Sequence, residues 1–314
     1  MKVNRRSFFA GSLALAAGSL LPAAAQARPE ELATLLDLSK CIGCGACVEA
    51  CREANAQKFP EPEKPFPPMY PSKVKAADWS DKRDVVDRLT PYNWLFIQTV
   101  SGEYNGKPFE LNIPRRCLHC QNPPCANLCP WGAAAKDSRG IVRINDEICL
   151  GGAKCKDVCP WHIPERQTGV GLYLKLAPGF AGNGVMYKCD RCQDRVAAGG
   201  IPACIEACPE GVQTIGPRAE ILAQAKDLAA KTGGFIYGET ENGGTNTFYV
   251  SPVPFDVLNA ALTPEPGRPH LAAVGNPFST EDLLARAVYA APIVGAVAGV
   301  LHLVRGATTE DDHE

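Results

Sequence analysis

The sequence predicts an α+β protein that is rich in loops, with two compact units built around its cysteines and one transmembrane helix near its C-terminus. Three observations favour this class. The fifteen cysteines of the 314-residue chain fall into four tight groups. Between these groups only short strand-like stretches and one clear helical pattern can be recognised. A run of eighteen uncharged residues stands close to the end of the chain.

The four cysteine groups have closely related spacings. The first is C-x2-C-x2-C-x3-C and the second is C-x2-C-x4-C-x3-C. The third follows the first, except that Gly152 occupies the second cysteine position, and the fourth is C-x2-C-x11-C-x3-C. A proline directly follows the last cysteine in three of the groups. The groups are Cys41, Cys44, Cys47 and Cys51; Cys117, Cys120, Cys125 and Cys129; Cys149, Cys155 and Cys159; and Cys189, Cys192, Cys204 and Cys208.

A compact cysteine run that ends in Cys-Pro is typical of bacterial ferredoxins, which bind iron–sulfur clusters. Cysteines on a tight loop can bind three corners of a cubic cluster. The fourth cysteine, after three intervening residues, is expected to start a helix and to ligate the neighbouring cluster. Gly43 and Gly45 permit the positive φ and close backbone approach that such a loop requires. Four groups therefore predict a series of clusters that conducts electrons.

Three other uses of cysteine fit the spacing less well. Structural zinc sites take separated cysteine pairs or Cys/His sets rather than four cysteines within eleven residues. A disulfide framework is thinkable for an exported chain, but the odd number of cysteines and the ferredoxin spacing disfavour it. Covalent haem attachment needs C-x-x-C-H, and the sequence has no such run.

The N-terminus predicts a twin-arginine signal peptide over residues 1–27. Arg5 and Arg6 precede an apolar stretch from Phe8 to Leu21, and Ala25-Gln26-Ala27 resembles a cleavage site. The alternative is a disordered tail with a chance arginine pair. An exported protein that already holds clusters must cross the membrane folded, and the twin-arginine route carries folded proteins. The expected location is the periplasmic side of a bacterial inner membrane.

The uncharged run Ala287–Val304 predicts a transmembrane helix over residues 283–305. At 1.5 Å per residue it would span roughly 27 Å, close to the thickness of a hydrocarbon core. Gly295 and Gly299 form a G-x-x-x-G pair that lets another helix approach closely. The alternative is a buried helix of a soluble domain. His302 could bind a haem, although such a histidine more often sits at the membrane interface.

The middle of the chain predicts a few regular elements and no nucleic-acid site. The formal net charge is −2, and no basic stripe follows one face. Proline-rich residues 60–71 are expected to be irregular. Alanine and leucine at helical spacing predict a helix over 219–231. The expected strands are 93–100, 109–113, 141–144 and 247–250.

Beyond the cysteines, several longer stretches resemble one family. The chain resembles the four-cluster iron–sulfur (beta) subunits of molybdopterin oxidoreductases of the DMSO reductase type. It is most similar to the twin-arginine-exported, C-terminally anchored version found with periplasmic nickel–iron hydrogenases and multihaem cytochrome complexes. The stretches that carry the resemblance are Arg116-Cys117-Leu-His-Cys120, Lys188-Cys189-Asp-Arg-Cys192, Gly200 to Pro209, Tyr237-Gly238-Glu239 with Gly243-Gly244-Thr245, and Ser251 to Phe255.

The resemblance implies three 4Fe–4S clusters and one 3Fe–4S cluster. The three-iron cluster follows from Gly152, which leaves one corner without a thiolate; His162 or Asp157 is the alternative ligand there. The implied ligand sets are Cys41, Cys44, Cys47 and Cys208 for the first cluster; Cys189, Cys192, Cys204 and Cys51 for the second; Cys117, Cys120, Cys125 and Cys159 for the third; and Cys149, Cys155 and Cys129 for the three-iron cluster.

The resemblance also implies a division into two nested bacterial-ferredoxin-like domains, each of the 2 × 4Fe–4S type. Groups one and four would form the outer domain around groups two and three. The expected parts are residues 28–58 with 166–217 (outer domain), 59–110 (insertion), 111–165 (inner domain), 218–282 (partner-docking segment), 283–305 (transmembrane helix) and 306–314 (cytoplasmic tail).

The function expected from these patterns is electron transfer. No residue set resembles a nucleophile with its base, and no phosphate-binding loop occurs, so no catalytic site is expected. The expected partners are a periplasmic catalytic subunit (a nickel–iron hydrogenase or molybdopterin enzyme) or a multihaem cytochrome c, and a polytopic quinone-reactive membrane subunit. The alternatives are a membrane-anchoring or assembly scaffold with structural clusters, and an enzyme that uses the open iron corner.

Overall fold

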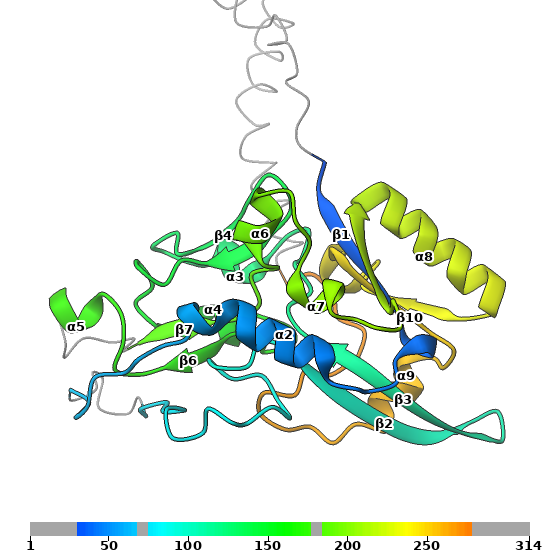
Figure 1. Cartoon of the computed structure of the whole chain (residues 1–314), viewed down its shortest axis with the longest axis horizontal. Coiled ribbons are helices and arrows are strands. Elements are labelled where there is room, and N and C mark those ends of the chain that lie inside the picture. The colour runs from blue at the N-terminus through cyan, green and yellow to red at the C-terminus, as the bar shows by residue number, and fades with distance from the viewer. Residues whose placement is uncertain (1–29, 68–74, 177–183, 278–314) are drawn as a thin grey trace, which may run out of the picture. The chain divides into compact units, whose positions relative to one another are not determined.

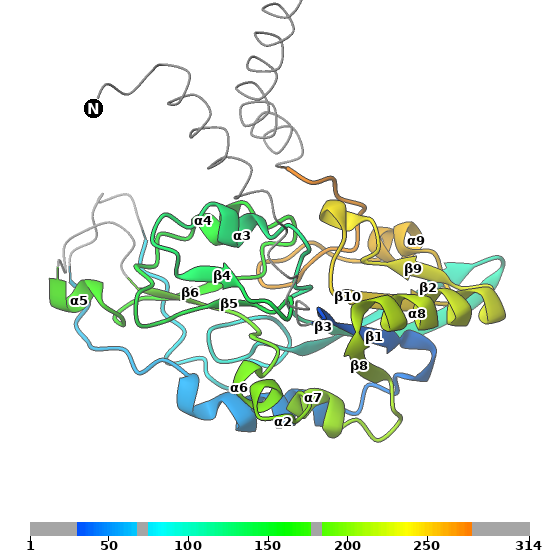
Figure 2. The same cartoon turned by 90° about the horizontal axis from the view of Figure 1, so that it is seen from above.

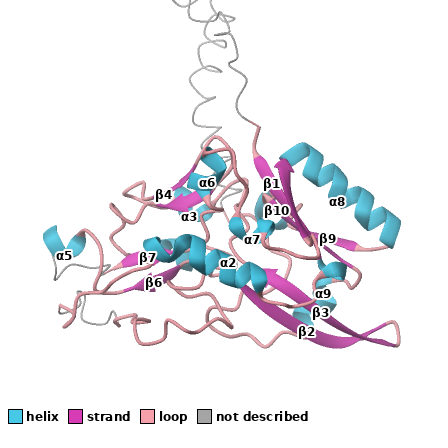
Figure 3. Ribbon diagram, viewed as in Figure 1, coloured by secondary structure: helices cyan, strands magenta, loops and turns pink. Residues whose placement is uncertain are grey.

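The computed structural model describes residues 30–67, 75–176 and 184–277. Short helices and strands joined by long loops make up most of this part, as Figures 1 and 3 show. The elements all lie in one compact unit that begins at Glu31. The predicted signal peptide and transmembrane helix fall outside the described residues. Within those residues, no helix has the length and apolar character needed to cross a bilayer.

A four-stranded sheet joins the beginning of the described chain to its end. Its order is β8-β1-β10-β9, with β1 parallel to β10 and the other pairs antiparallel. Alternate residues of β1 point to opposite faces. Ala33 and Leu35 therefore pack under helix α8, whereas Leu36 belongs to the core that contains the cysteines. The strands are β1 (Leu32–Asp37), β8 (Gln213–Pro217), β9 (Phe235–Tyr237) and β10 (Thr247–Ser251).

Helix α8 (Arg218–Thr232) covers one face of this sheet (Figure 2). Ile221, Ala225 and Ala229 are buried at intervals of four residues, as expected for one stripe of a helix. The helix ends at Gly233, whose φ of 65° is the left-handed conformation common at helix C-termini. The helix predicted over 219–231 is confirmed to within one residue at each end.

A long antiparallel hairpin joins β2 (Phe96–Tyr104) to β3 (Lys107–Arg115). Its two-residue turn is Asn105-Gly106, and both residues have positive φ, as a type I′ turn requires. The strands predicted over 93–100 and 109–113 exist, but both extend to this turn. The predicted domain boundary at 110/111 lies inside β3. Every residue of β2 pairs with a residue of β3, so the hairpin is not divided at that point.

The remaining elements are short. The predicted strand 141–144 corresponds to β5, and the predicted strand 247–250 corresponds to β10. The two-stranded ladders are β4 (Ala134–Lys136) with β5 (Val142–Ile144) and β6 (Glu165–Gln167) with β7 (Val185–Tyr187). The helices are α2 (Ala46–Asn55), α3 (Pro124–Asn127), α4 (Lys154–Asp157), α5 (Tyr173–Leu176), α6 (Gln193–Ala197), α7 (Ala203–Glu206) and α9 (Phe255–Ala260), with 3-10 turns η1 (Leu38–Lys40), η2 (Ala56–Lys58) and η3 (Glu241–Gly243).

The expectation that each fourth cysteine starts a helix is wrong. The third cysteine of a group lies in a helix instead, and the fourth lies one turn later. In α2, for example, Cys47 and Cys51 both belong to the helix, whereas Cys129 follows α3. Residues four apart stand one above the other on one helix face. The x3 spacing therefore separates the two thiols by one helical turn.

The α8 interface can be tested by truncating one buried side chain. Ile221→Ala should destabilise the protein by about 2–4 kcal/mol, because it removes buried methyl groups and leaves a cavity. The exposed neighbour Glu220 provides the matched control, and Glu220→Ala should change stability by less than about 0.5 kcal/mol. Chemical denaturation measures both. Equal effects of the two variants would contradict this packing.

Candidate metal centres

The structure gathers the fifteen cysteines into four sets, each of which lines its own cavity. Every set combines residues from two sequence groups, and the sets are those that the resemblance implies. Their role as cluster ligands remains a prediction at this point. We call them site 1 (Cys41, Cys44, Cys47 and Cys208), site 2 (Cys51, Cys189, Cys192 and Cys204), site 3 (Cys117, Cys120, Cys125 and Cys159) and site 4 (Cys129, Cys149 and Cys155).

Short helices connect the sites in pairs. Helix α2 carries a cysteine of site 1 and one of site 2, and it packs against α7, which also leads from site 2 to site 1. Helices α3 and α4 pack together in the same way between sites 3 and 4. Figure 2 shows α2 and α7 on one side of the molecule and α3 and α4 on the other. His119, in the loop of site 3, lies 3.8 Å from Cys189 Sγ of site 2, so sites 2 and 3 are also neighbours and the order is 1, 2, 3, 4.

The four cysteine loops share one unusual backbone position. The second residue after the first cysteine of each group has positive φ: 72° at Gly43, 51° at His119, 66° at Gly151 and 55° at Arg191. Positive φ strains residues other than glycine. The loop of the third group therefore keeps the turn of the other three, although it lacks their second cysteine.

Site 4 is the open one. Its cavity measures about 480 Å³, against about 20 Å³ at sites 1 and 3. Gly152 lines this cavity, and a Cβ built on it would meet no atom within 4 Å. Its φ lies outside the left-handed region. A cysteine side chain would therefore fit there without backbone strain.

The two alternative ligands lie elsewhere. His162 lines a different cavity, and its Nδ1 lies 3.1 Å from the carbonyl oxygen of Lys156. Asp157 is exposed and forms an ion pair with Lys154 at 3.6 Å. Neither side chain lines the cavity of site 4.

Three or four cysteine thiols line each cavity, and such thiols are the ligands of iron–sulfur clusters. In the part of the chain that the structure describes, no three His, Cys, Asp or Glu side chains are arranged to hold one metal ion. All fifteen cysteines lie in that part, and all are free thiols. Burial raises the pKa of Cys47, Cys159 and Cys189 to about 12 each. Because thiolates are the ligands, cluster binding must displace these protons.

Three basic side chains, Arg116, Lys188 and Arg191, are buried beside the sites, and a fourth, Arg115, is buried over the ring of Tyr249. None takes part in an ion pair within the described residues. Burial alone would lower the pKa of Arg116, but the nearby thiolates outweigh it and raise that pKa. An anionic cluster is the counter-charge that such buried cations require.

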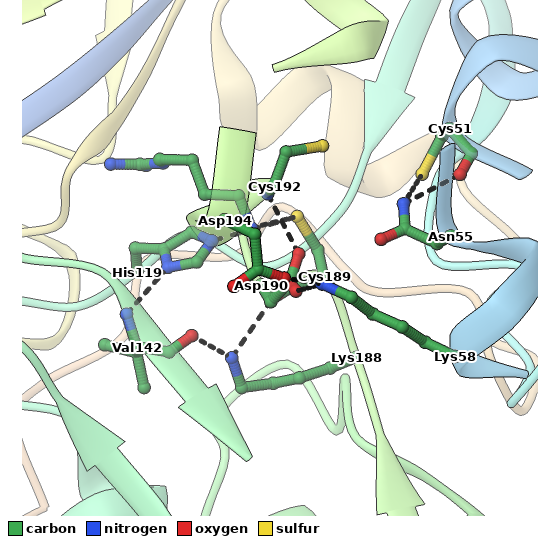
Figure 4. Close-up of polar contacts among 11 residues, drawn as sticks. Cys51, Asn55, Lys58, His119, Val142, Lys188, Cys189, Asp190, Cys192 and Asp194 are labelled. Carbon is green, nitrogen blue, oxygen red and sulfur yellow. Dashed lines mark hydrogen bonds and ion pairs between the residues drawn. The ribbon is translucent and has the colours of Figure 1, made fainter. Parts of the chain in front are cut away.

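Side chains donate hydrogen bonds to three cysteines of site 2. Arg116 Nη1 lies 3.1 Å from Cys204 Sγ, and Asn55 Nδ2 lies 3.7 Å from Cys51 Sγ. His119 Nε2 lies 3.8 Å from Cys189 Sγ (Figure 4). Hydrogen bonds to sulfur are one of the means by which a protein sets the potential of a cluster.

Comparison with known proteins shows the family. Two family profiles, both described as a 4Fe-4S dicluster domain, match residues 40–133 and 109–218. The hydrogenase-2 operon protein HybA of Escherichia coli O157:H7 is 30% identical, over 99% of this chain and 98% of the relative. The chain belongs to the family of iron–sulfur subunits of oxidoreductase complexes. Two further relatives come from Escherichia coli K12: the nitrate-inducible formate dehydrogenase iron–sulfur subunit (31% identical, over 70% of this chain and 68% of the relative) and the B subunit of anaerobic dimethyl sulfoxide reductase (32%, over 62% and 78%).

This subunit therefore transfers electrons and is not the catalytic subunit of its complex. Sequence reasoning missed the residues that surround the cysteines. Arg116 and Lys188 stood out only as part of the stretches that resemble the family, and the role of His119 was not anticipated. One signal was available, because a basic residue directly precedes the first cysteine in groups one, two and four, although Lys40 of group one is exposed.

Removal of iron should destabilise the subunit strongly. Without clusters the buried cations lose their counter-charge, and each unpaired buried charge costs about 3–5 kcal/mol. Chelation under anaerobic conditions should lower the melting temperature by about 10 °C or more, and reconstitution should restore it. Calorimetry before and after chelation measures the melting temperature. If the iron-free protein melts at the original temperature, the charges of the buried basic side chains are balanced by groups other than the clusters.

Proposed function

We propose that this subunit relays electrons along sites 1 to 4, between a periplasmic catalytic or multihaem cytochrome subunit and a quinone-reactive membrane subunit. The observation that carries this proposal is the order of the sites, in which paired helices lead from site 1 to site 2 and from site 3 to site 4. When bound, the clusters supply one-electron redox chemistry. The chain holds them in sequence and sets their potentials through buried charge and hydrogen bonds to sulfur.

The cofactors that we propose are three 4Fe–4S clusters at sites 1, 2 and 3 and one 3Fe–4S cluster at site 4. Each of the first three cavities has four cysteines on its lining, and the fourth has three. A glycine in the usual turn, with open space where a thiol would stand, supports the three-iron assignment. Within this scheme, sites 1 and 2 form the outer ferredoxin-like domain and sites 3 and 4 the inner one.

The partners should meet the two ends of this series. Beside site 1, Ile42 is 62% exposed, and beside site 4, Trp131 is 63% exposed. The predicted docking segment 218–282 contains α8, β9, β10 and α9, and the exposed residues of α8 offer further surface. The likeness to a hydrogenase-2 operon protein over nearly the whole chain favours a hydrogenase as the catalytic partner.

The proposed location is the periplasmic face of the inner membrane. The twin-arginine pattern at Arg5 and Arg6 supports export, and the uncharged run Ala287–Val304 supports a C-terminal anchor. Residues 306–314 would then lie in the cytoplasm. The subunit and its quinone-reactive partner would then lie at the same membrane.

The cofactor content gives the sharpest test of this scheme. Anaerobically purified full-length subunit should contain about fifteen irons and show a three-iron EPR signal in its oxidised form. Gly152→Cys supplies the fourth corner and should abolish that signal, raising the content to about sixteen irons. Gly152→Ala adds a Cβ without a thiol, so it should leave the signal unchanged. A wild-type protein with sixteen irons and no three-iron signal would refute the assignment.

Truncation tests the anchor. A chain that ends before Leu283 lacks the proposed span and should be recovered in the soluble fraction, with its iron content unchanged. Fractionation should be done in cells without the partner subunits, because contacts with them could also hold the protein at the membrane. Retention of the truncated chain in the membrane fraction under these conditions would rule out this anchor.

A further inference from the structure

The step between sites 2 and 3 differs from the other two steps. Sites 1 and 2 share α2 and α7, and sites 3 and 4 share α3 and α4. In the described residues, no helix carries cysteines of both site 2 and site 3. The loops of cysteine groups two and four meet there instead, and two side chains cross between them in opposite directions.

His119 is the first of these side chains. It belongs to the loop of site 3, between Cys117 and Cys120, but its ring reaches Cys189 of site 2. The backbone N–H of Val142 donates to His119 Nδ1 at 3.0 Å. That nitrogen must therefore be unprotonated, and the ring proton lies on Nε2, which faces the sulfur (Figure 4).

The backbone indicates that the side chain itself is needed at this position. Residue 119 has a φ of 51°, and glycine occupies the equivalent position in two other loops, as Gly43 and Gly151. Glycine adopts this conformation without strain, whereas histidine does not. The strain is compensated by the contacts that the ring makes across the junction.

Lys188 crosses in the other direction. It directly precedes Cys189 of site 2, but its side chain lines the cavity of site 3. Its Nζ donates to the carbonyl oxygens of Val142, at 2.5 Å, and Cys189, at 3.1 Å. Val142, at the start of β5, thus holds both side chains: its N–H donates to His119, and its carbonyl accepts from Lys188.

We propose that His119 and Lys188 form the junction across which electrons pass between sites 2 and 3, with His119 tuning site 2 and Lys188 tuning site 3. The inference rests on the proposed relay. In the transfer, one site loses an electron as the other gains it, and no bond forms or breaks. A hydrogen bond to sulfur or a nearby positive charge stabilises the more negative, reduced form. Each residue therefore raises the potential of the site that it faces.

His119→Asn separates tuning from folding. Asparagine tolerates positive φ and can accept the Val142 N–H, but it is too short to reach Cys189. EPR-monitored redox titration of the full-length protein should show the reduction equilibrium of site 2 shifted on the order of tenfold toward the oxidised form, which is 59 mV for a one-electron couple. The other three sites should keep their potentials. His119→Gly, which matches Gly43 and Gly151 in the other loops, should give the same shift if the asparagine variant folds poorly.

Lys188→Met should act on the other side of the junction, lowering the potential of site 3 more than that of site 2. Lys107→Met is the control, because Lys107 is exposed at the turn of the β2–β3 hairpin and lines none of the four cysteine cavities. That variant should leave all potentials within error. The junction would be overturned if all four clusters titrate in His119→Asn, His119→Gly and Lys188→Met and none of these variants shifts the potential of a single site. That result would leave the relay intact. Absence of clusters from the wild type would instead overturn the relay itself.

Discussion

The convergence of thiols from distant segments is the constraint on which the rest of this structure depends. Site 1 needs residues as far apart as Cys41 and Cys208, and site 2 needs Cys51 beside Cys189. The sheet that pairs β1 with β8 and β10 brings these parts of the chain together. Because the helices near the cysteines are short and the loops long, clusters and their buried counter-charges would supply much of the core that larger elements provide elsewhere.

Cysteines four positions apart in sequence are placed at two adjacent sites by the geometry of a helix. Two cysteines separated by three residues stand one turn apart on α2, so they line adjacent cavities rather than the same one. The pairing of α2 with α7 and of α3 with α4 repeats this relation. A row of sites follows from local helix geometry, and only the middle step depends on long side chains from the two loops.

Much of the site could be predicted from the sequence, because cysteine spacing carries the geometry of the loops. The helix α8 was also predictable, since its apolar residues have a clear period. The ends of β2 and β3 were missed because their outer residues are polar and exposed, and the Asn105-Gly106 turn was overlooked. The burial of Arg115 could not be inferred, since nothing in a single sequence distinguishes it from an arginine on the surface. Nor does the spacing reveal that His119 reaches across to the neighbouring site.

Anomalous diffraction at the iron edge, measured on crystals of the anaerobic protein, tests the central claim most directly. The account predicts four separate iron centres, one in each cysteine-lined cavity, in the order 1, 2, 3, 4. It also predicts that the centre at Cys129, Cys149 and Cys155 contains one iron fewer than the others. Fewer than four centres, single metal ions in place of clusters, or cysteines grouped in other sets would contradict it.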